Sequence, residues 1–180
     1  MDKDIESPDA CIRRLRPEAF TLIELLIVIA IIAVLAGLGF AGVNGALKTA
    51  RKAEVRAMAS QIKLALSAYY TEYGVYPTNT SSDTAFLSMM APTNASVAPT
   101  SNRRGIRFLD VPPKFTNANG IVTPPKFYPD NKQINFRIKV DTNYDGRLIL
   151  RLGSSTTNIG GTAAVWVDDP DNTTKVIGTW

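Results

Sequence analysis

Oxygen-bearing side chains gather in one short segment of the sequence, between residues 141 and 146. The segment is Asp-Thr-Asn-Tyr-Asp-Gly, so carboxylate and amide oxygens alternate at Asp141, Asn143 and Asp145. Alternating oxygens followed by a glycine form the first half of an EF-hand loop, which converges on a hard cation such as Ca²⁺. An EF-hand also needs a bidentate glutamate at its twelfth position, which is Leu152 here. The segment is therefore a candidate calcium loop but not an EF-hand.

The remaining ligands of such a loop would have to come from other parts of the chain. Backbone carbonyls are one source, and a second acidic group, Asp168, Asp169 and Asp171, is the other. The residue types at 141–146 are also typical of an Asx-rich turn that joins two strands. Both interpretations stay open, and calcium is the only cofactor that the sequence indicates.

Composition excludes several other kinds of chemistry. The chain has 180 residues, with no histidine and a single cysteine, Cys11. Without histidine there is no Ser-His-Asp or Cys-His catalysis and no imidazole metal ligand. One cysteine forms neither an intramolecular disulfide nor a multi-cysteine metal site. The sequence also lacks a glycine-rich phosphate loop, a nucleophile motif and an HExxH pattern. We therefore expect a protein that is not an enzyme.

The basic residues do not indicate a nucleic-acid partner. The chain has 20 Lys and Arg against 16 Asp and Glu, a formal net charge of +4. These residues are scattered, whereas nucleic-acid binding favours a basic stripe with interleaved aromatic residues. A small cluster at Arg103, Arg104 and Arg107 is either part of a solvated loop or a contact for an acidic partner or lipid.

The strongest feature of the sequence is an apolar segment near its beginning. No charged residue occurs from Leu25 to Leu47, and roughly 20 apolar residues in a helix span the hydrocarbon core of a bilayer. Basic residues precede the segment and predict a cytoplasmic N-terminus, but others follow it and weaken this asymmetry. The first group is Arg13, Arg14 and Arg16, and the second is Lys48, Arg51, Lys52 and Arg56.

Three interpretations of the apolar segment compete. The first is a secretory signal peptide that is cut near Val34-Leu35-Ala36, although its apolar core is long for that class. The second is a plain membrane anchor that is not cleaved. The third is a membrane anchor whose first residues have a function of their own. The third depends on Glu24, at the edge of the segment. A carboxylate among apolar residues is costly in a membrane and so is a functional candidate, unless it merely reaches back to lipid headgroups.

The junction before this segment resembles the leader junction of type IV pilins and type II secretion pseudopilins. The resemblance rests on residues 16–32, and above all on Phe-Thr-Leu-Ile-Glu-Leu-Leu at 20–26. It implies that a prepilin peptidase cuts between Ala19 and Phe20, and that Phe20 is then N-methylated. It also implies that Glu24 pairs with the free amine of Phe20 on a neighbouring subunit.

The chain departs from the family pattern at two points. Ala19 occupies the position before the cut, where glycine is usual, and the usual proline in the middle of the apolar helix is absent. Gly37, Gly39 and Gly42 lie in that region instead. They either loosen the helix during assembly, since glycine disfavours helix by about 1 kcal/mol relative to alanine, or allow close helix packing.

The helix is predicted to continue beyond the apolar segment as an amphipathic helix. Apolar residues recur at steps of three and four, at Val55, Met58, Ile62, Leu66, Tyr69 and Tyr73. Gly74 and Pro77 then predict a helix end at about Tyr73. The sequence Tyr-Gly-Val-Tyr-Pro at 73–77 resembles the helix end of major, G-like pseudopilins.

The rest of the chain falls into two parts. Residues 77–132 are rich in proline and predict an irregular surface connection, with a short helical turn at 85–90. Alternating apolar residues predict strands at 133–140, 147–152 and 162–167, the first two joined by a hairpin loop at 141–146. We expect these strands to form one small antiparallel sheet on which the amphipathic helix packs.

Together these features predict a pilin-like α+β fold. Residues 1–19 would be a cytoplasmic leader, 20–47 a transmembrane and filament-core helix, and 48–180 a periplasmic or extracellular head. The resemblance implies a structural subunit of a type II secretion pseudopilus, located in the bacterial inner membrane and then in a helical filament. Its partners would be the inner membrane, the prepilin peptidase, other pilin-like subunits and the assembly machinery. A type IV pilin for adhesion, motility or DNA uptake is the alternative, and a membrane-anchored binding domain is a third class.

Overall fold

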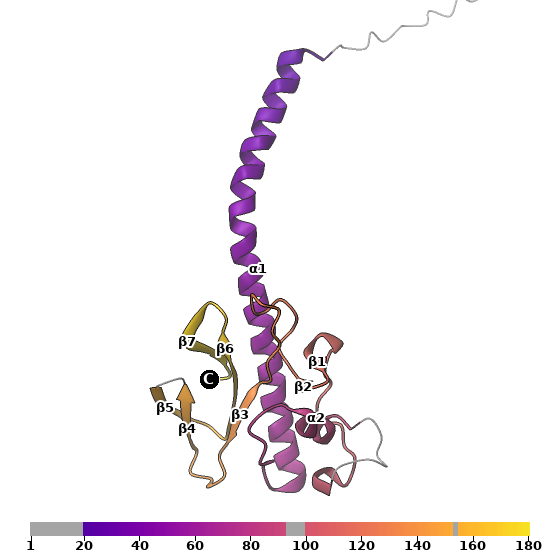
Figure 1. Ribbon diagram of the computed structural model, residues 1–180, viewed down its shortest axis with the longest axis vertical. Helices are drawn as coiled ribbons and strands as arrows, with labels where there is room; N and C mark the ends of the chain where they lie inside the picture. Colours follow the sequence, from indigo (N-terminus) through magenta and orange to yellow (C-terminus); the bar gives the residue numbers. More distant parts are fainter. Residues whose placement is uncertain (1–19, 93–99, 153–154) are drawn as a thin grey trace, which may run out of the picture. The chain divides into compact units, whose positions relative to one another are not determined.

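The computed structural model describes residues 20–92, 100–152 and 155–180, without the side chains of 38–42, 100 and 173. The leader, Ala19, Cys11 and the three arginines before the apolar segment lie outside the described residues. The chain divides into two compact units, Met1–Asn44 and Gly45–Trp180. The first helix, α1 (Leu22–Tyr73), contributes residues to both (Figure 1).

In the first unit, α1 exposes apolar side chains on every side. Consecutive residues from Leu25 to Ile29 are all exposed, which no amphipathic helix shows. In the part of the chain that the structure describes, no helix meets the requirements of length and apolarity for crossing a membrane. The predicted membrane span at 25–47 is not confirmed.

In the second unit, α1 is amphipathic and ends where the sequence predicts. Val55, Ile62 and Leu66 are fully buried, as the apolar periodicity requires. The helix ends at Tyr73, and Gly74 has a φ of +72° and donates its N–H to the Tyr70 carbonyl at 2.8 Å. A left-handed residue directly after the last turn is a common helix end, and glycine adopts it without steric cost.

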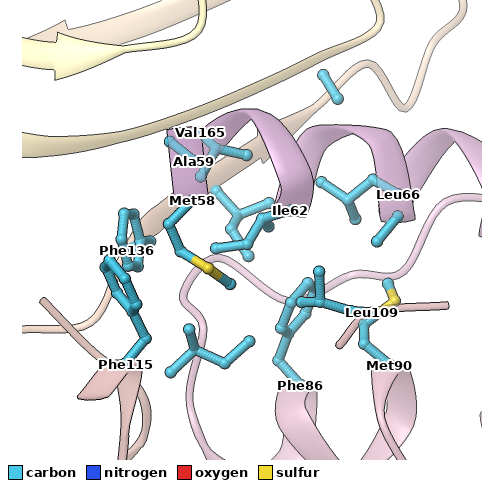
Figure 2. Close-up of a cluster of buried hydrophobic side chains, with 14 of the residues drawn as sticks. Met58, Ala59, Ile62, Leu66, Phe86, Met90, Leu109, Phe115, Phe136 and Val165 are labelled. Atoms are coloured by element: carbon cyan, nitrogen blue, oxygen red, sulfur yellow. The ribbon is translucent and has the colours of Figure 1, made fainter. Parts of the chain in front are cut away.

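The proline-rich region is not the surface connection that its composition predicts. It contains α2 (Thr84–Met90), the short 3₁₀ helices η2 (Thr100–Asn102) and η3 (Pro113–Phe115), and a ribbon of β1 (Thr116–Asn117) and β2 (Gly120–Ile121). Figure 2 shows Phe86 and Met90 of α2 facing Ile62 and Leu66 of α1. The prediction was wrong because the apolar residues between the prolines are buried in the core. They include Phe86, Met90, Leu109, Phe115, Ile121, Val122 and Phe127.

The described strands after residue 133 form two sheets rather than the one that the sequence predicts. The strands β3 (Arg137–Val140), β6 (Ala163–Asp169) and β7 (Asn172–Gly178) form an antiparallel sheet in the order β3-β6-β7. The strands β4 (Arg147–Leu152) and β5 (Ser155–Gly160) form a separate antiparallel pair. The segment 141–146 therefore connects two sheets and is not the predicted hairpin loop, because β3 pairs with β6 and not with β4.

Two apolar clusters hold the second unit together. The larger one lies between α1, α2 and the β3-β6-β7 sheet, with Ile62, Phe86 and Val165 at its centre. The smaller one joins the two sheets through Leu148 and Leu150 of β4 and Ala164 and Trp166 of β6. The predicted α+β architecture, a helix packed on small antiparallel sheets, is confirmed.

Candidate processing and assembly site

The first described residue, Phe20, directly follows the predicted processing point. Phe20 is 76% exposed. Ala19, on the other side of the bond to be cut, lies outside the described residues. The bond itself is therefore placed by sequence alone, whereas the helix that follows it is described from its first turn.

Thr21 and Glu24 form a reciprocal cap at the beginning of α1. The Thr21 backbone N–H and hydroxyl both donate to Oε2 of Glu24, at 2.8 and 2.7 Å. The Glu24 N–H donates in return to Oγ1 of Thr21 at 3.3 Å. This is a capping box, in which a threonine at the N-cap and a glutamate three residues later satisfy each other's backbone donors. The Thr-x-x-Glu pattern at 21–24, directly before the apolar segment, is the sequence signal of this cap.

The cap gives Glu24 a structural task within its own chain. Its negative charge also lies at the positive end of the helix dipole, where carboxylates are favourable. Both contacts use Oε2, and among the described residues no hydrogen bond to Oε1 is present. The second carboxylate oxygen is thus available to a donor from another molecule.

The segment 141–146 brings together one of the two predicted groups of calcium ligands. Asp141 is 2% exposed, and its Oδ2 accepts the Gly146 N–H at 2.7 Å. Asn143 donates to Oδ2 of Asp145 at 2.9 Å, and Oδ1 of Asp145 accepts the Arg147 N–H at 2.8 Å. These residues line a cavity of about 490 Å³. Gly146 has a φ of +73°, so the turn needs the glycine found there.

One oxygen in this cavity has no partner. Oδ1 of Asp141 is buried and makes no hydrogen bond within the described chain. An unpartnered buried carboxylate oxygen is costly and calls for a cation, a water or another donor. This atom is the one observation that favours a cation at the loop.

The second acidic group, Asp168, Asp169 and Asp171, lies at the end of β6 that is far from the 141–146 loop. Asp141 donates its N–H to Thr162, just before β6, whereas Asp168 and Asp169 end that strand. Six residues of strand separate the two places by about 20 Å. The structure therefore does not bring Asp168, Asp169 and Asp171 to the loop. Among the described residues, no three or more Asp, Glu, Cys or His side chains are arranged to hold a metal ion.

The second acidic group has basic partners of its own. Asp168 pairs with Arg137 at 3.0 Å, and Lys52 of α1 lies 2.8 Å from Asp169 and 2.9 Å from Asp171. The hydrogen bonds that Lys52 donates to Asp169 and, second, to Asp171 raise the pKa of Lys52. Hydrogen bonds from Lys52 and Lys48 lower the pKa of Asp171. These pairs tie the β6-β7 turn to α1, which sequence spacing could not have shown.

The predicted basic cluster at 103–107 is partly neutralised. Arg104 pairs with Glu72 of α1, and Arg107 lies 3.5 Å from Asp110. Arg103 is exposed. Surface pairs of this kind contribute little to stability, and the cluster forms no continuous basic surface.

The fold and the site define a class of protein: an α+β chain with a pilin-like arrangement of helix and sheets, and an exposed apolar helix with a capped start. Residues 15–40 match the family model described as the prokaryotic N-terminal methylation motif, a type IV pilin-like signal. The match contains Ala19, Phe20 and Glu24. No curated protein and no solved structure matches the chain.

Proposed function

We propose that this chain is a structural subunit of a type II secretion pseudopilus. The observation that carries the proposal is the methylation motif at 15–40, which implies processing by a prepilin peptidase and pilus-like assembly. The families that bear this motif are structural rather than enzymatic. In the proposal, the peptidase cuts between Ala19 and Phe20, and Phe20 becomes the N-methylated first residue.

The exposed apolar surface of α1 is the surface through which neighbouring subunits would associate. Its side chains have no partners within the described unit and would be buried against lipid before assembly and against neighbouring helices afterwards. Removal of apolar surface from water contributes about 25 cal/mol per Å² in either environment, so the exchange of lipid for neighbouring helices would be favoured by close packing between helices. The side chains concerned are exposed at Leu22, Ile23, Leu25, Leu26, Ile27, Val28, Ile29, Ile31, Ile32, Val34 and Leu35.

Glu24 would set the register between subunits. Cleavage creates an amine at Phe20, and the Oε1 atom of Glu24 makes no hydrogen bond among the described residues. An ion pair between Glu24 of one subunit and the Phe20 amine of the next would cancel both charges within an apolar bundle. The capping box holds the carboxylate in place before the partner arrives.

A type IV pilin is the alternative within the same class. Only one cysteine occurs in the chain, at position 11 in the predicted leader. The head after Phe20 therefore lacks the cysteine pair with which many pilins close a C-terminal loop, and this favours the pseudopilin. In either case we propose an inner-membrane subunit with a cytoplasmic N-terminus and a periplasmic head, which then joins a filament.

The decisive experiment is intact mass with N-terminal sequencing of the full chain, co-expressed with a prepilin peptidase. We expect a chain that begins at Phe20 and carries one additional methyl group. A chain that begins at Met1, or one cut after the apolar segment, would contradict the proposal. Genes for a secretin and an assembly ATPase beside this one would favour secretion over motility.

Calcium at the 141–146 loop is a separate proposal. Asp141, Asn143 and Asp145 would supply oxygen ligands, and the buried Oδ1 of Asp141, which has no hydrogen-bond partner among the described residues, supports the proposal. Calcium coordination needs six to eight oxygens, so backbone carbonyls and waters would complete the site. When bound, the ion would neutralise the buried carboxylate.

A further inference from the structure

A basic pocket opens beside the first turns of α1 in the second unit. It has a volume of about 330 Å³, within the range of about 300–1,000 Å³ that is usual for small-ligand sites. Four basic side chains and one acidic side chain line it: Lys48, Arg51, Lys52, Lys126 and Asp171. Phe127, Pro129 and Pro170 form its apolar wall. The excess of positive charge means that the pocket attracts an anion.

The two α1 lysines that line the pocket, Lys48 and Lys52, are largely neutralised. Lys52 pairs with both Asp169 and Asp171, and Lys48 lies 3.3 Å from Asp171. Arg51 and Lys126 form no salt bridge within the described chain, and both are exposed. The uncompensated charge of the pocket therefore comes from Arg51 and Lys126.

A hydrogen bond between the Arg51 side chain and the backbone of Lys126 joins these two residues. Arg51 donates from Nη1 to the carbonyl of Lys126 at 3.1 Å. Lys126 has a φ of +63°, a left-handed conformation that residues with a side chain seldom adopt. Its N–H donates to the Asn131 side chain at 3.1 Å, which closes that turn. The bond to a neutral carbonyl uses one guanidinium donor and leaves the charge of Arg51 and its other donors for a ligand.

The pocket follows directly on the apolar segment. Lys48 comes immediately after Leu47, the last residue of the uncharged segment. Leu47 is 49% exposed and lies one helical turn before Arg51, so the two residues share one face of α1. A ligand on this face meets an apolar surface first and a cationic group next.

We propose that this pocket binds the phosphate headgroup of an anionic phospholipid. A guanidinium fork recognises phosphate oxygens in a bidentate manner, and Lys126 adds a second point charge. The apolar wall and Leu47 accommodate the glycerol and the beginning of the acyl chains, which a free phosphate ion would not use. The inference rests on the proposed membrane association of the subunit, and it deepens it by naming the lipid class.

The test uses the full chain in detergent, mixed with equal amounts of phosphatidylglycerol and phosphatidylcholine that have the same acyl chains. Native mass spectrometry then counts the lipid that each variant retains. We expect the unmodified chain to prefer phosphatidylglycerol. In R51Q/K126Q the affinity for phosphatidylglycerol should fall by roughly thirtyfold, since each basic residue near an anionic headgroup contributes on the order of a factor of five.

The matched control is R151Q/K175Q, which removes one arginine and one lysine from exposed positions on β4 and β7. It should retain phosphatidylglycerol within about twofold of the unmodified chain, because long-range charge alone is screened by salt. The charge-preserving variant R51K/K126R should keep most of the preference. Circular dichroism and thermal melting of each variant establish that it is folded.

Three results would overturn the proposal. They are equal loss of phosphatidylglycerol in R51Q/K126Q and in the control, no preference between the two lipids, and displacement of the lipid by inorganic phosphate at an equal concentration. N-terminal sequencing of the same samples reports on processing independently. A chain that is cut before Phe20 but shows no lipid preference would contradict this inference without contradicting the proposed function.

Discussion

Thr21 and Glu24 satisfy each other's backbone donors at the first turn of α1, with Oε2 of the carboxylate 2.8 Å from the Thr21 nitrogen. Glu24 therefore has two separable tasks, one within its chain and one proposed between chains. The cap needs only a side-chain oxygen, whereas pairing with an amine needs the charge.

Replacing Glu24 by glutamine separates these tasks. Glutamine also serves in a capping box, so we expect E24Q to keep the beginning of α1 and to be processed normally. Filament assembly should be lost, because the Phe20 amine of the next subunit would be left without a counter-charge. Electron microscopy of sheared filaments and amide exchange at residues 22–25 measure the two effects.

The complementary variant is T21V, which removes the hydroxyl but keeps the Glu24 charge. We expect faster amide exchange at Glu24 and continued filament formation. If E24Q assembled as well as T21V, the proposed pairing of Glu24 with the amine would be wrong.

The effect of a leucine-to-alanine change in α1 on the free energy of unfolding should depend on whether the leucine lies on the buried or the exposed face of the helix. Leu66 is fully buried and Leu64, two residues earlier, is 71% exposed. We expect L66A to lower the free energy of unfolding by about 2–5 kcal/mol, through lost burial and the cavity left behind. We expect L64A to change it by less than about 0.5 kcal/mol. Urea denaturation of both variants checks this, and similar losses in the two would contradict the packing described.

The pairs between Lys52 and the β6-β7 turn predict a dependence of stability on pH. Asp171 has a lowered pKa in the folded chain, so its contribution is present above its unfolded pKa and is lost as the pH falls through the folded value. The thermal midpoint should therefore decrease below about pH 4. Lys52 has a raised pKa, so its contribution is present at neutral pH and is lost only in strong alkali.

D171N should flatten part of the acid limb of this profile. The matched control is D130N, a change of an exposed aspartate that accepts only a local N–H from Lys132. Thermal melting between pH 2 and 7, in steps of about half a unit, compares the two variants with the unmodified chain. An unchanged profile in D171N would show that the pair does not couple to folding.

Calcium should raise the thermal stability of the chain if the loop at 141–146 binds it. A ligand at a hundred times its Kd stabilises the folded state by about 2.7 kcal/mol. We expect D141N to abolish the response, because it removes the charge of the buried carboxylate. D168N should keep it, since Asp168 lies at the other end of β6 and pairs with Arg137. A calcium titration that leaves the melting temperature of the unmodified chain unchanged would contradict the proposal.

Local patterns predicted the helical parts of the fold well. The stripe at Val55, Ile62 and Leu66, the end of α1 at Tyr73 and the helical turn at α2 all follow from contacts between residues close in sequence. The sheet was predicted less well. The strand β5, Ser-Thr-Thr-Asn-Ile-Gly, has no apolar alternation, because its side chains are mostly exposed and its pairing with β4 is made by the backbone.

The sequence by itself determined the methylation motif, the apolar segment and the amphipathic face of α1, since periodicity and motif spacing are local properties. Only the tertiary structure decided that Asp141 and Asp168 lie at opposite ends of β6, that the proline-rich region fills the core, and that Lys126 meets Arg51. These relationships join residues far apart in the chain. They depend on strand register and close packing, which no pattern within a short window of residues specifies.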